Sequence, residues 1–211
     1  MLRKSDYKLA ITHLKTVDTV LGSIIDVKGE LTFFNPAATP YESIGRSIIG
    51  QQLSTKAATA IHKKVATQFG SYDDSTGIAT LPKPEELISL TEEKLHSAGL
   101  SRQKIITLKE IANYSIAGNL NQEILEKSDD EKIIEALTKI TGIGRWTAQM
   151  FLMNYLQRPD ILPIGDLGIR KAIQKNYGLL SLPTEKNVLL IGKHWHPWST
   201  IASRYLWLSL E

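Results

Sequence analysis

The chain has 211 residues, 42% of them hydrophobic, and its 25 Lys and Arg residues outnumber its 22 Asp and Glu residues. This length suits one domain or two small lobes, and the mildly basic charge permits a nucleic-acid partner without arguing for one. The absence of cysteine excludes disulfides, a thiolate nucleophile, cysteine-ligated zinc and an iron–sulfur cluster. Because the N-terminus lacks the apolar stretch of a signal peptide and no segment could span a bilayer, we expect an intracellular protein without membrane contact.

Helical spacing of apolar residues recurs along the chain, whereas strand signals are scarce. In chain order, spacing and capping residues predict helices over about 5–22, 41–69 with a break at 50–54, 84–90, 91–99, 101–116, 128–140, 145–158, 166–177 and much of 184–211. Ser128, with Glu131 three residues on, has the spacing of a capping box. The connections 27–42 and 70–83 are irregular and rich in Gly, Pro or polar residues. This pattern predicts an all-α protein.

The most informative segment is 137–148, Leu-Thr-Lys-Ile-Thr-Gly-Ile-Gly-Arg-Trp-Thr-Ala. Gly142 and Gly144 flank one apolar residue between two predicted helices. Two glycines permit a tight turn and leave backbone N–H groups uncovered at the start of the second helix, where the helix dipole favours an anion. Taken alone, the Gly-x-Gly spacing fits an ordinary helical hairpin as well as a phosphate-binding turn.

The wider pattern resembles the helix-hairpin-helix of the DNA glycosylase (HhH-GPD) superfamily, usually written Leu-Pro-Gly-[Val/Ile]-Gly-x-x-Thr-Ala, with Thr141 here in place of Pro. The resemblance implies a hairpin over about 131–157 that binds DNA backbone phosphate without reading sequence. The residues that it assigns to this contact are Gly142, Gly144, Arg145 and Thr147. Family members often also hold a monovalent cation, Na⁺ or K⁺, through loop carbonyls, here by position those of Thr138, Ile140 and Ile143.

Asp166 follows Leu162-Pro-Ile-Gly at the predicted start of a helix, where Asp is a favoured N-cap. The family carries an essential Asp after a Gly- and Pro-containing loop beyond the hairpin, so the resemblance assigns the catalytic role to Asp166. Breaking the glycosidic bond builds positive charge on the sugar, which a carboxylate can stabilise while it orients or deprotonates water. Asp160, Asp129 and Asp130 share only the residue type and lack this context.

Trp146 stands where bifunctional members of the superfamily carry the Lys whose amine attacks the sugar. Its presence favours hydrolysis without a lyase step. Trp at this position resembles the 3-methyladenine DNA glycosylase II group, and an aromatic face attracts cationic bases and stacks on a flipped base. The tail 195–207 resembles the same group, with Trp207 matching a base-pocket Trp and Ser199 replacing a common Arg. Core packing is the alternative for each of these tryptophans.

A third element is Ile-Ile-Gly-Gln-Gln-Leu-Ser at 48–54, which resembles the family segment whose side chain fills the gap left by a flipped base. Gln52 aligns with the inserted position and Leu53 is the adjacent alternative; the assigned DNA-binding residues are Gln51, Gln52, Leu53 and Ser54. The alternative is that both glutamines bond helix ends and Leu53 is core. The Gly-Leu-Ser-x-x-Lys element at 99–104 also resembles the family and is expected to be structural. Candidate phosphate contacts elsewhere are Lys56, Lys104, Arg170 and Lys171.

We therefore expect a two-lobed, all-α HhH-GPD fold with an active-site cleft between the lobes and Asp166 facing Trp146. One six-helix lobe would span 40–157, and 1–39 with 158–211 would form the lobe that carries Asp166. The expected function is hydrolysis of the N-glycosidic bond of alkylated purines, 3-methyladenine or 7-methylguanine, after base flipping in double-stranded DNA. A monomer is expected, in the cytoplasm or nucleoid of a prokaryote or the nucleus of a eukaryote.

Two alternatives stay open: a monofunctional glycosylase for another lesion, whose pocket would need polar groups, and a non-catalytic damage-binding protein with the same fold. No catalytic metal or cofactor is expected, since His62, His194 and His196 lack metal-ligand spacing with acidic partners.

Overall fold

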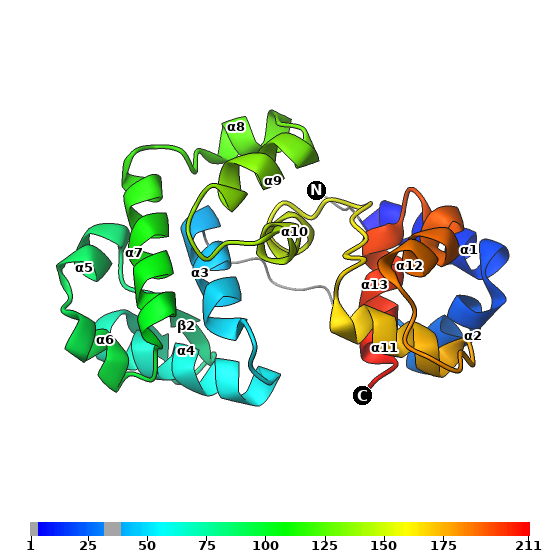
Figure 1. Cartoon of the computed structure of the whole chain (residues 1–211), viewed down its shortest axis with the longest axis horizontal. Coiled ribbons are helices and arrows are strands. Elements are labelled where there is room, and N and C mark those ends of the chain that lie inside the picture. The colour runs from blue at the N-terminus through cyan, green and yellow to red at the C-terminus, as the bar shows by residue number, and fades with distance from the viewer. Residues whose placement is uncertain (1–3, 32–38) are drawn as a thin grey trace. The chain divides into compact units, whose positions relative to one another are not determined.

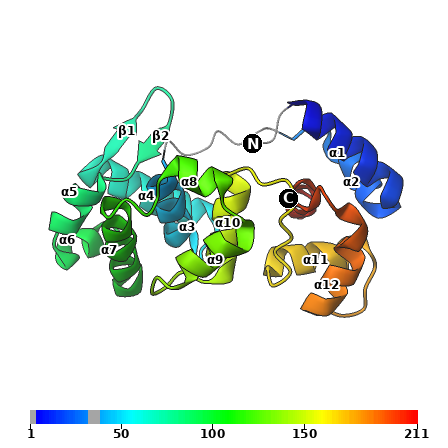
Figure 2. The same ribbon diagram turned by 90° about the horizontal axis from the view of Figure 1, so that it is seen from above.

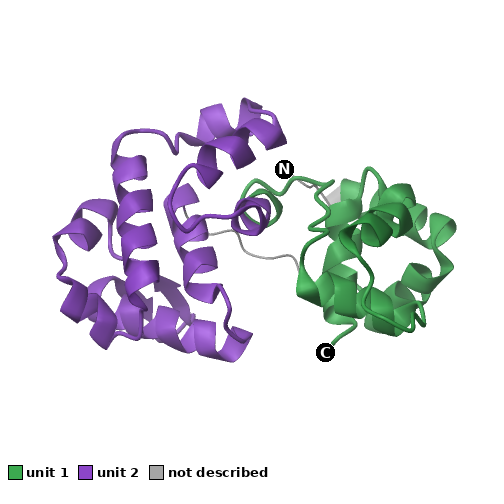
Figure 3. Cartoon of the chain, viewed as in Figure 1, with its two compact units in different colours: residues 1–35, 152–211 green, residues 36–151 purple. Residues whose placement is uncertain are grey.

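The computed structural model describes residues 4–31 and 39–211, which are mainly helical (Figure 1). The chain divides into two compact units, one of residues 36–151 and one of residues 1–35 with 152–211 (Figure 3). Helix α10 (Arg145–Asn154) begins in the first of these and ends in the second. Among the described residues, no helix combines the length and the apolar character that crossing a membrane requires.

The unit of residues 36–151 is built around α7 (Arg102–Ile116), against which α3 (Pro40–Gly50), α5 (Pro84–Ser89) and α6 (Glu92–Ser97) pack (Figure 1). Its remaining elements are α4 (Thr55–Phe69), β1 (Ser71–Asp73), β2 (Ile78–Thr80), α8 (Gln122–Lys127), α9 (Asp130–Thr138) and the first turns of α10. The two strands pair antiparallel and contact α4 (Figure 2). Both helices of the α3–α7 pair contribute buried apolar side chains to this unit, Ile44 and Ile48 from α3 and Leu108 and Ile111 from α7.

A buried carboxylate ties three elements of this unit together. Glu42 on α3 is 4% exposed and accepts hydrogen bonds from Arg46 Nε (2.9 Å), His62 Nε2 of α4 (3.1 Å) and the backbone N–H of Leu81 (2.8 Å). Burial by itself would raise the pKa of Glu42, but these hydrogen bonds and the Arg46 charge outweigh it and lower the pKa. Glu42 therefore fixes the end of the β-hairpin against α3 and α4.

The second unit contains α1 (Lys4–Val17), α2 (Thr19–Lys28), α11 (Leu167–Asn176), α12 (Glu185–Gly192), the 3₁₀ turn η1 (Lys193–Trp195) and α13 (Ser199–Leu208). α1 and α2 lie side by side, and α13 packs against α1, α2 and α11 (Figure 2). The inner face of α13 is fully or nearly buried at Ile201, Ala202, Tyr205 and Leu206. Trp195 is fully buried in the same core, so core packing is the role of this tryptophan.

Three local predictions were wrong, each for a different physical reason. The expected single helix over 5–22 breaks at Asp18, which caps α2 and accepts hydrogen bonds from Tyr177 Oη (2.6 Å) and Trp195 Nε1 (2.8 Å). The expected loop 70–83 contains the β-hairpin, whose three-residue strands are too short to show a period. The residue at the N-cap of α9 is Asp129 and not Ser128, whose hydroxyl donates to the carbonyl of Ile124 (2.7 Å) at the end of α8.

Candidate active site

Asp166 is the N-cap of α11 and is partly exposed. Its Oδ1 accepts a hydrogen bond from the backbone N–H of Ile169 (2.7 Å) and a second from the indole Nε1 of Trp207 (2.9 Å). The first bond is the ordinary capping contact of a helix start. The second comes from α13, so two elements set the orientation of this carboxylate.

Gly168 provides the space for this arrangement. A Cβ at Gly168 would lie 3.0 Å from Asp166 Oδ1, 3.0 Å from Trp207 Cδ1 and 3.1 Å from Trp207 Nε1, all tighter than ordinary van der Waals contact. The indole can therefore approach the first turn of α11 only because this residue has no side chain. Gly168 was not among the predicted site residues, although a glycine two residues after the assigned Asp, inside a predicted helix, was the available signal.

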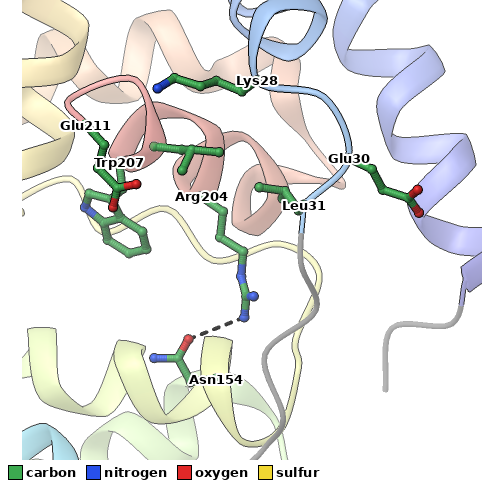
Figure 4. A pocket seen from close by; sticks show the side chains of 8 residues that line it. Lys28, Glu30, Leu31, Asn154, Arg204, Trp207 and Glu211 are labelled. Atoms are coloured by element: carbon green, nitrogen blue, oxygen red, sulfur yellow. Dashed lines mark hydrogen bonds between the residues drawn. The ribbon is translucent and has the colours of Figure 1, made fainter. Parts of the chain in front are cut away.

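Trp207 also lines a cavity of about 460 Å³ within the unit that carries Asp166 (Figure 4). The other lining residues are Lys28, Glu30, Leu31, Asn154, Arg204, Leu208 and Glu211. Arg204 is turned toward Asn154 in Figure 4, and its Nη2 donates to the carbonyl of Met153 (3.0 Å) and to Asn154 Oδ1 (3.3 Å). Burial lowers the pKa of the Arg204 guanidinium. The cavity thus combines one indole with oriented polar groups.

The hairpin between α9 and α10 uses its two glycines differently. Gly142 has φ +85°, and a Cβ there would overlap Thr107 Oγ1 and lie 3.2 Å from Thr107 Cβ and Cγ2. A Cβ at Gly144 would meet nothing within 4 Å, and the Gly144 carbonyl accepts the N–H of Ala148 (3.2 Å) in the first bond of α10. Gly142 is thus required by backbone and packing, whereas Gly144 leaves the helix start uncovered.

The other hairpin candidates occupy different environments. Arg145 is exposed and bound through both terminal nitrogens to Glu131, Nη1 lying 2.9 Å from Oε2. Trp146 is 37% exposed on the first turn of α10, and Thr147 is buried. Ile140, one of the three residues whose carbonyls were assigned to a cation, accepts the backbone N–H of Ile143 (3.0 Å).

The segment after α3 meets this hairpin through Gln51, whose Nε2 donates to the carbonyl of Gly142 (3.1 Å) and to Thr147 Oγ1 (2.9 Å). Gln51 therefore ties the turn after α3 to the hairpin and to the first turn of α10. Gln52 and Leu53 are exposed, and Ser54 Oγ caps α4 by accepting from the N–H of Ala57 (3.3 Å).

Two of the basic candidates are engaged internally. The Lys104 ammonium donates to the carbonyls of Ile49 (2.7 Å) and Gln51 (3.0 Å), and Arg170 Nε donates to the carbonyl of Pro183 (2.8 Å). Lys56 and Lys171 are exposed.

Residues 46–197 match the HhH-GPD superfamily of base excision DNA repair proteins, which is most of the chain. The chain belongs to this superfamily. It is 37% identical over 169 residues to DNA-3-methyladenine glycosylase 1 of Schizosaccharomyces pombe, covering 80% of this chain and 71% of that protein. The alkylbase DNA glycosidase-like protein mag2 of the same yeast is 32% identical over 209 residues, covering 98% and 95%.

Solved structures agree with this assignment. The S. pombe 3-methyladenine DNA glycosylase in complex with abasic DNA has a TM-score of 0.83 and 34% identity, covering 94% of both chains. The expected HhH-GPD fold and the relation to the 3-methyladenine DNA glycosylase group are thereby confirmed.

Proposed function

We propose that this HhH-GPD protein excises alkylated purines, such as 3-methyladenine and 7-methylguanine, from double-stranded DNA by hydrolysis. The observation that carries the proposal is the partly exposed Asp166, which two hydrogen bonds orient beside the indole of Trp207. The similarity to glycosylases for 3-methyladenine supports alkylated purines as the substrate class. Because its proposed substrate is DNA, we propose that the protein acts inside the cell.

In the proposed reaction the bond between the sugar C1′ and the base nitrogen breaks, and its electron pair leaves with the base. Positive charge develops on the sugar, where the Asp166 carboxylate stabilises it and accepts a proton from the attacking water as the new C1′–O bond forms. A base alkylated on a ring nitrogen is already cationic, so it departs as a neutral molecule without a strong general acid. Trp207 keeps the carboxylate oriented during this step through its N–H.

The proposal includes no lyase step, because Trp146 occupies the hairpin position at which a Lys amine would attack the sugar. An aromatic residue there can instead stack on the extruded base.

For the DNA backbone, we propose that the amides at the start of α10, beside the uncovered Gly144, bind a phosphate. We also propose that the carbonyls of Thr138, Ile140 and Ile143 hold a Na⁺ or K⁺ ion. Thr138 ends α9, where the last carbonyls lack intrahelical donors, and the Ile140 carbonyl keeps a second lone pair beside the hydrogen bond that it accepts from Ile143. A bound cation would add positive charge at this turn.

One observation favours a second candidate, excision of a neutral lesion. The cavity beside Trp207 includes Arg204 and Asn154, whose polar groups could read a neutral base by hydrogen bonding.

The test is release of free base from methylated duplex DNA by the wild type and by Asp166→Asn. Asp18→Asn is a matched control, because Asp18 also caps a helix of the same unit and accepts an indole N–H, from Trp195 (2.8 Å). We expect release without strand nicking by the wild type and by Asp18→Asn, and none by Asp166→Asn.

Equal release by Asp166→Asn would remove this residue from the mechanism. Release of a neutral lesion only would favour the second candidate. Tight binding of abasic duplex without release of any base would favour a non-catalytic damage-binding protein.

A further inference from the structure

The chain reverses sharply after α3 in a turn that an L-residue adopts reluctantly. The N–H of Leu53 bonds to the carbonyl of Gly50 (3.2 Å), Gln51 has φ −52° and ψ 130°, and Gln52 has φ +58°. These angles are typical of a type II turn, whose third residue is usually glycine. A glutamine in the left-handed region persists only where surrounding contacts hold it there, and such residues concentrate at functional sites.

Lys104 of α7 supplies such a contact. Its ammonium donates to the carbonyls of Ile49 and Gln51, at 2.7 and 3.0 Å. These carbonyls lie at the C-terminal end of α3, where intrahelical donors are lacking and the helix dipole is negative. The ammonium is partly buried, which strengthens its attraction to the carbonyls. The side-chain amide of Gln51, bonded to the hairpin, is the second anchor of the turn.

The same helix carries a second lysine in the same role. The Lys109 ammonium donates to the carbonyls of Ile88 (3.2 Å) and Leu90 (2.6 Å) at the end of α5. The two lysines therefore use one chemistry, an ammonium on the last carbonyls of a neighbouring helix, but hold different segments. Of the two lysines, Lys104 is the one that bonds to the turn containing Gln52.

We propose that Lys104 is a positioning residue for base flipping, which holds the turn Gly50–Leu53 so that the Gln52 side chain can occupy the gap left by the extruded base. The inference rests on the proposed function, because it requires that the protein flips bases. It also assigns Lys104 a role inside the protein in place of the DNA phosphate contact that the sequence suggested.

This role predicts a dependence on how firmly the lesion is stacked. Unstacking costs least for a mispaired base, so a defect in the inserted turn should matter most when the lesion is fully paired. A lost phosphate contact would instead weaken binding to all duplexes alike and reduce the salt dependence of binding. If Lys104 had only a structural role, its loss would lower stability and would slow release of paired and mispaired lesions to the same extent.

The experiment compares Lys104→Met with Lys109→Met, each of which removes one ammonium from α7 and keeps an apolar chain. Thermal unfolding should show similar losses for both. In single-turnover release, Lys104→Met should be slowed about tenfold or more on a paired lesion and much less on a mispaired one, whereas Lys109→Met should match the wild type on both. Gln51→Leu, which removes the second anchor without changing charge, should follow the pattern of Lys104→Met.

A readout that needs no catalysis separates this inference from the proposed function. 2-Aminopurine fluorescence in duplex DNA rises when the enzyme unstacks the base, and it should rise with the wild type and Lys109→Met but much less with Lys104→Met. Fluorescence that rises without release of any alkylated base would refute the proposed function alone. Equal fluorescence with both lysine variants, a smaller salt dependence with Lys104→Met, or no rise with the wild type would overturn the role of Lys104.

Discussion

Separate replacement of the two hairpin glycines should affect different properties, the stability of the fold for Gly142 and the affinity for DNA for Gly144. Gly142→Ala places a Cβ at φ +85°, in a region that costs an L-residue roughly 1–2 kcal/mol, and drives it into the side chain of Thr107. Thr107 is 1% exposed and its hydroxyl donates to the carbonyl of Gln103 (3.0 Å), so the side chain cannot turn into solvent to make room. Overpacking of this kind adds about 1–3 kcal/mol.

The sum predicts that Gly142→Ala lowers the free energy of unfolding by about 2–5 kcal/mol, a large share of the stability of a typical domain. Gly144→Ala meets no atom within 4 Å and should change that free energy by less than about 1 kcal/mol. The added methyl would, however, cover the helix start proposed to bind phosphate. We therefore expect weaker duplex affinity from Gly144→Ala at unchanged stability.

The assay is denaturant unfolding of each variant together with duplex affinity by fluorescence anisotropy at several salt concentrations. Thr107→Ala removes the overlapping hydroxyl and one methyl, so it should recover about 1–2 kcal/mol of the Gly142→Ala loss in a double-mutant cycle. Equal destabilisation by Gly144→Ala and Gly142→Ala, or a cycle without coupling to Thr107, would contradict the different roles of the two glycines.

Three further predictions concern single side chains. Glu42→Gln should lower the free energy of unfolding near neutral pH by about 1–3 kcal/mol, because a neutral amide replaces the buried carboxylate that accepts hydrogen bonds from Arg46, His62 and the backbone of Leu81. Because the folded-state pKa of Glu42 is lowered, the carboxylate stabilises the fold above the usual pKa of Glu, and this stabilisation is lost as pH falls through the folded-state pKa. The unfolding free energies of the wild type and Glu42→Gln should therefore converge from neutral to acid pH. A difference that stays constant with pH would contradict this. Trp207→Phe keeps a ring in the cavity but removes the N–H donor to Asp166. Single-turnover base release should therefore slow about tenfold while the affinity for abasic duplex is retained. An unchanged rate would show that this hydrogen bond does not contribute to catalysis. Gln52→Gly relieves the left-handed strain, so stability measured by thermal unfolding should hold or rise while excision slows, and a parallel loss of both would argue against a role in base flipping.

The local pattern was sufficient for the elements that carry strong short-range signals. Periodicity and caps located most helices, and Asp166 was expected at a helix start, where it caps α11. The break at Asp18 was missed because the partners of that carboxylate, Tyr177 and Trp195, lie far along the chain. The β-hairpin was missed because its strands are short and Glu42 secures its end from another helix.

In the candidate site, too, the sequence identified residues whose contacts only the structure could show. Matching motifs drew attention to Gln51, Thr147 and Lys104, but residue type alone cannot say whether an amide or an ammonium points to solvent or to a neighbouring carbonyl. The structure places all three in contacts between α3, α7 and the hairpin. Gly168 had no assigned role until its separation from Trp207 could be measured.

By itself, the sequence determined the helical class, the hairpin motif, the placement of Asp166 at a helix start and the family, because each depends on residue identity and spacing within a short stretch. Only the tertiary structure decided that Trp207 orients Asp166, that Gly142 and Gly144 differ, and that Lys104 holds the turn of Gln52. Those facts depend on distances of a few ångströms between residues far apart in the chain, which packing of the whole core sets and no local pattern encodes.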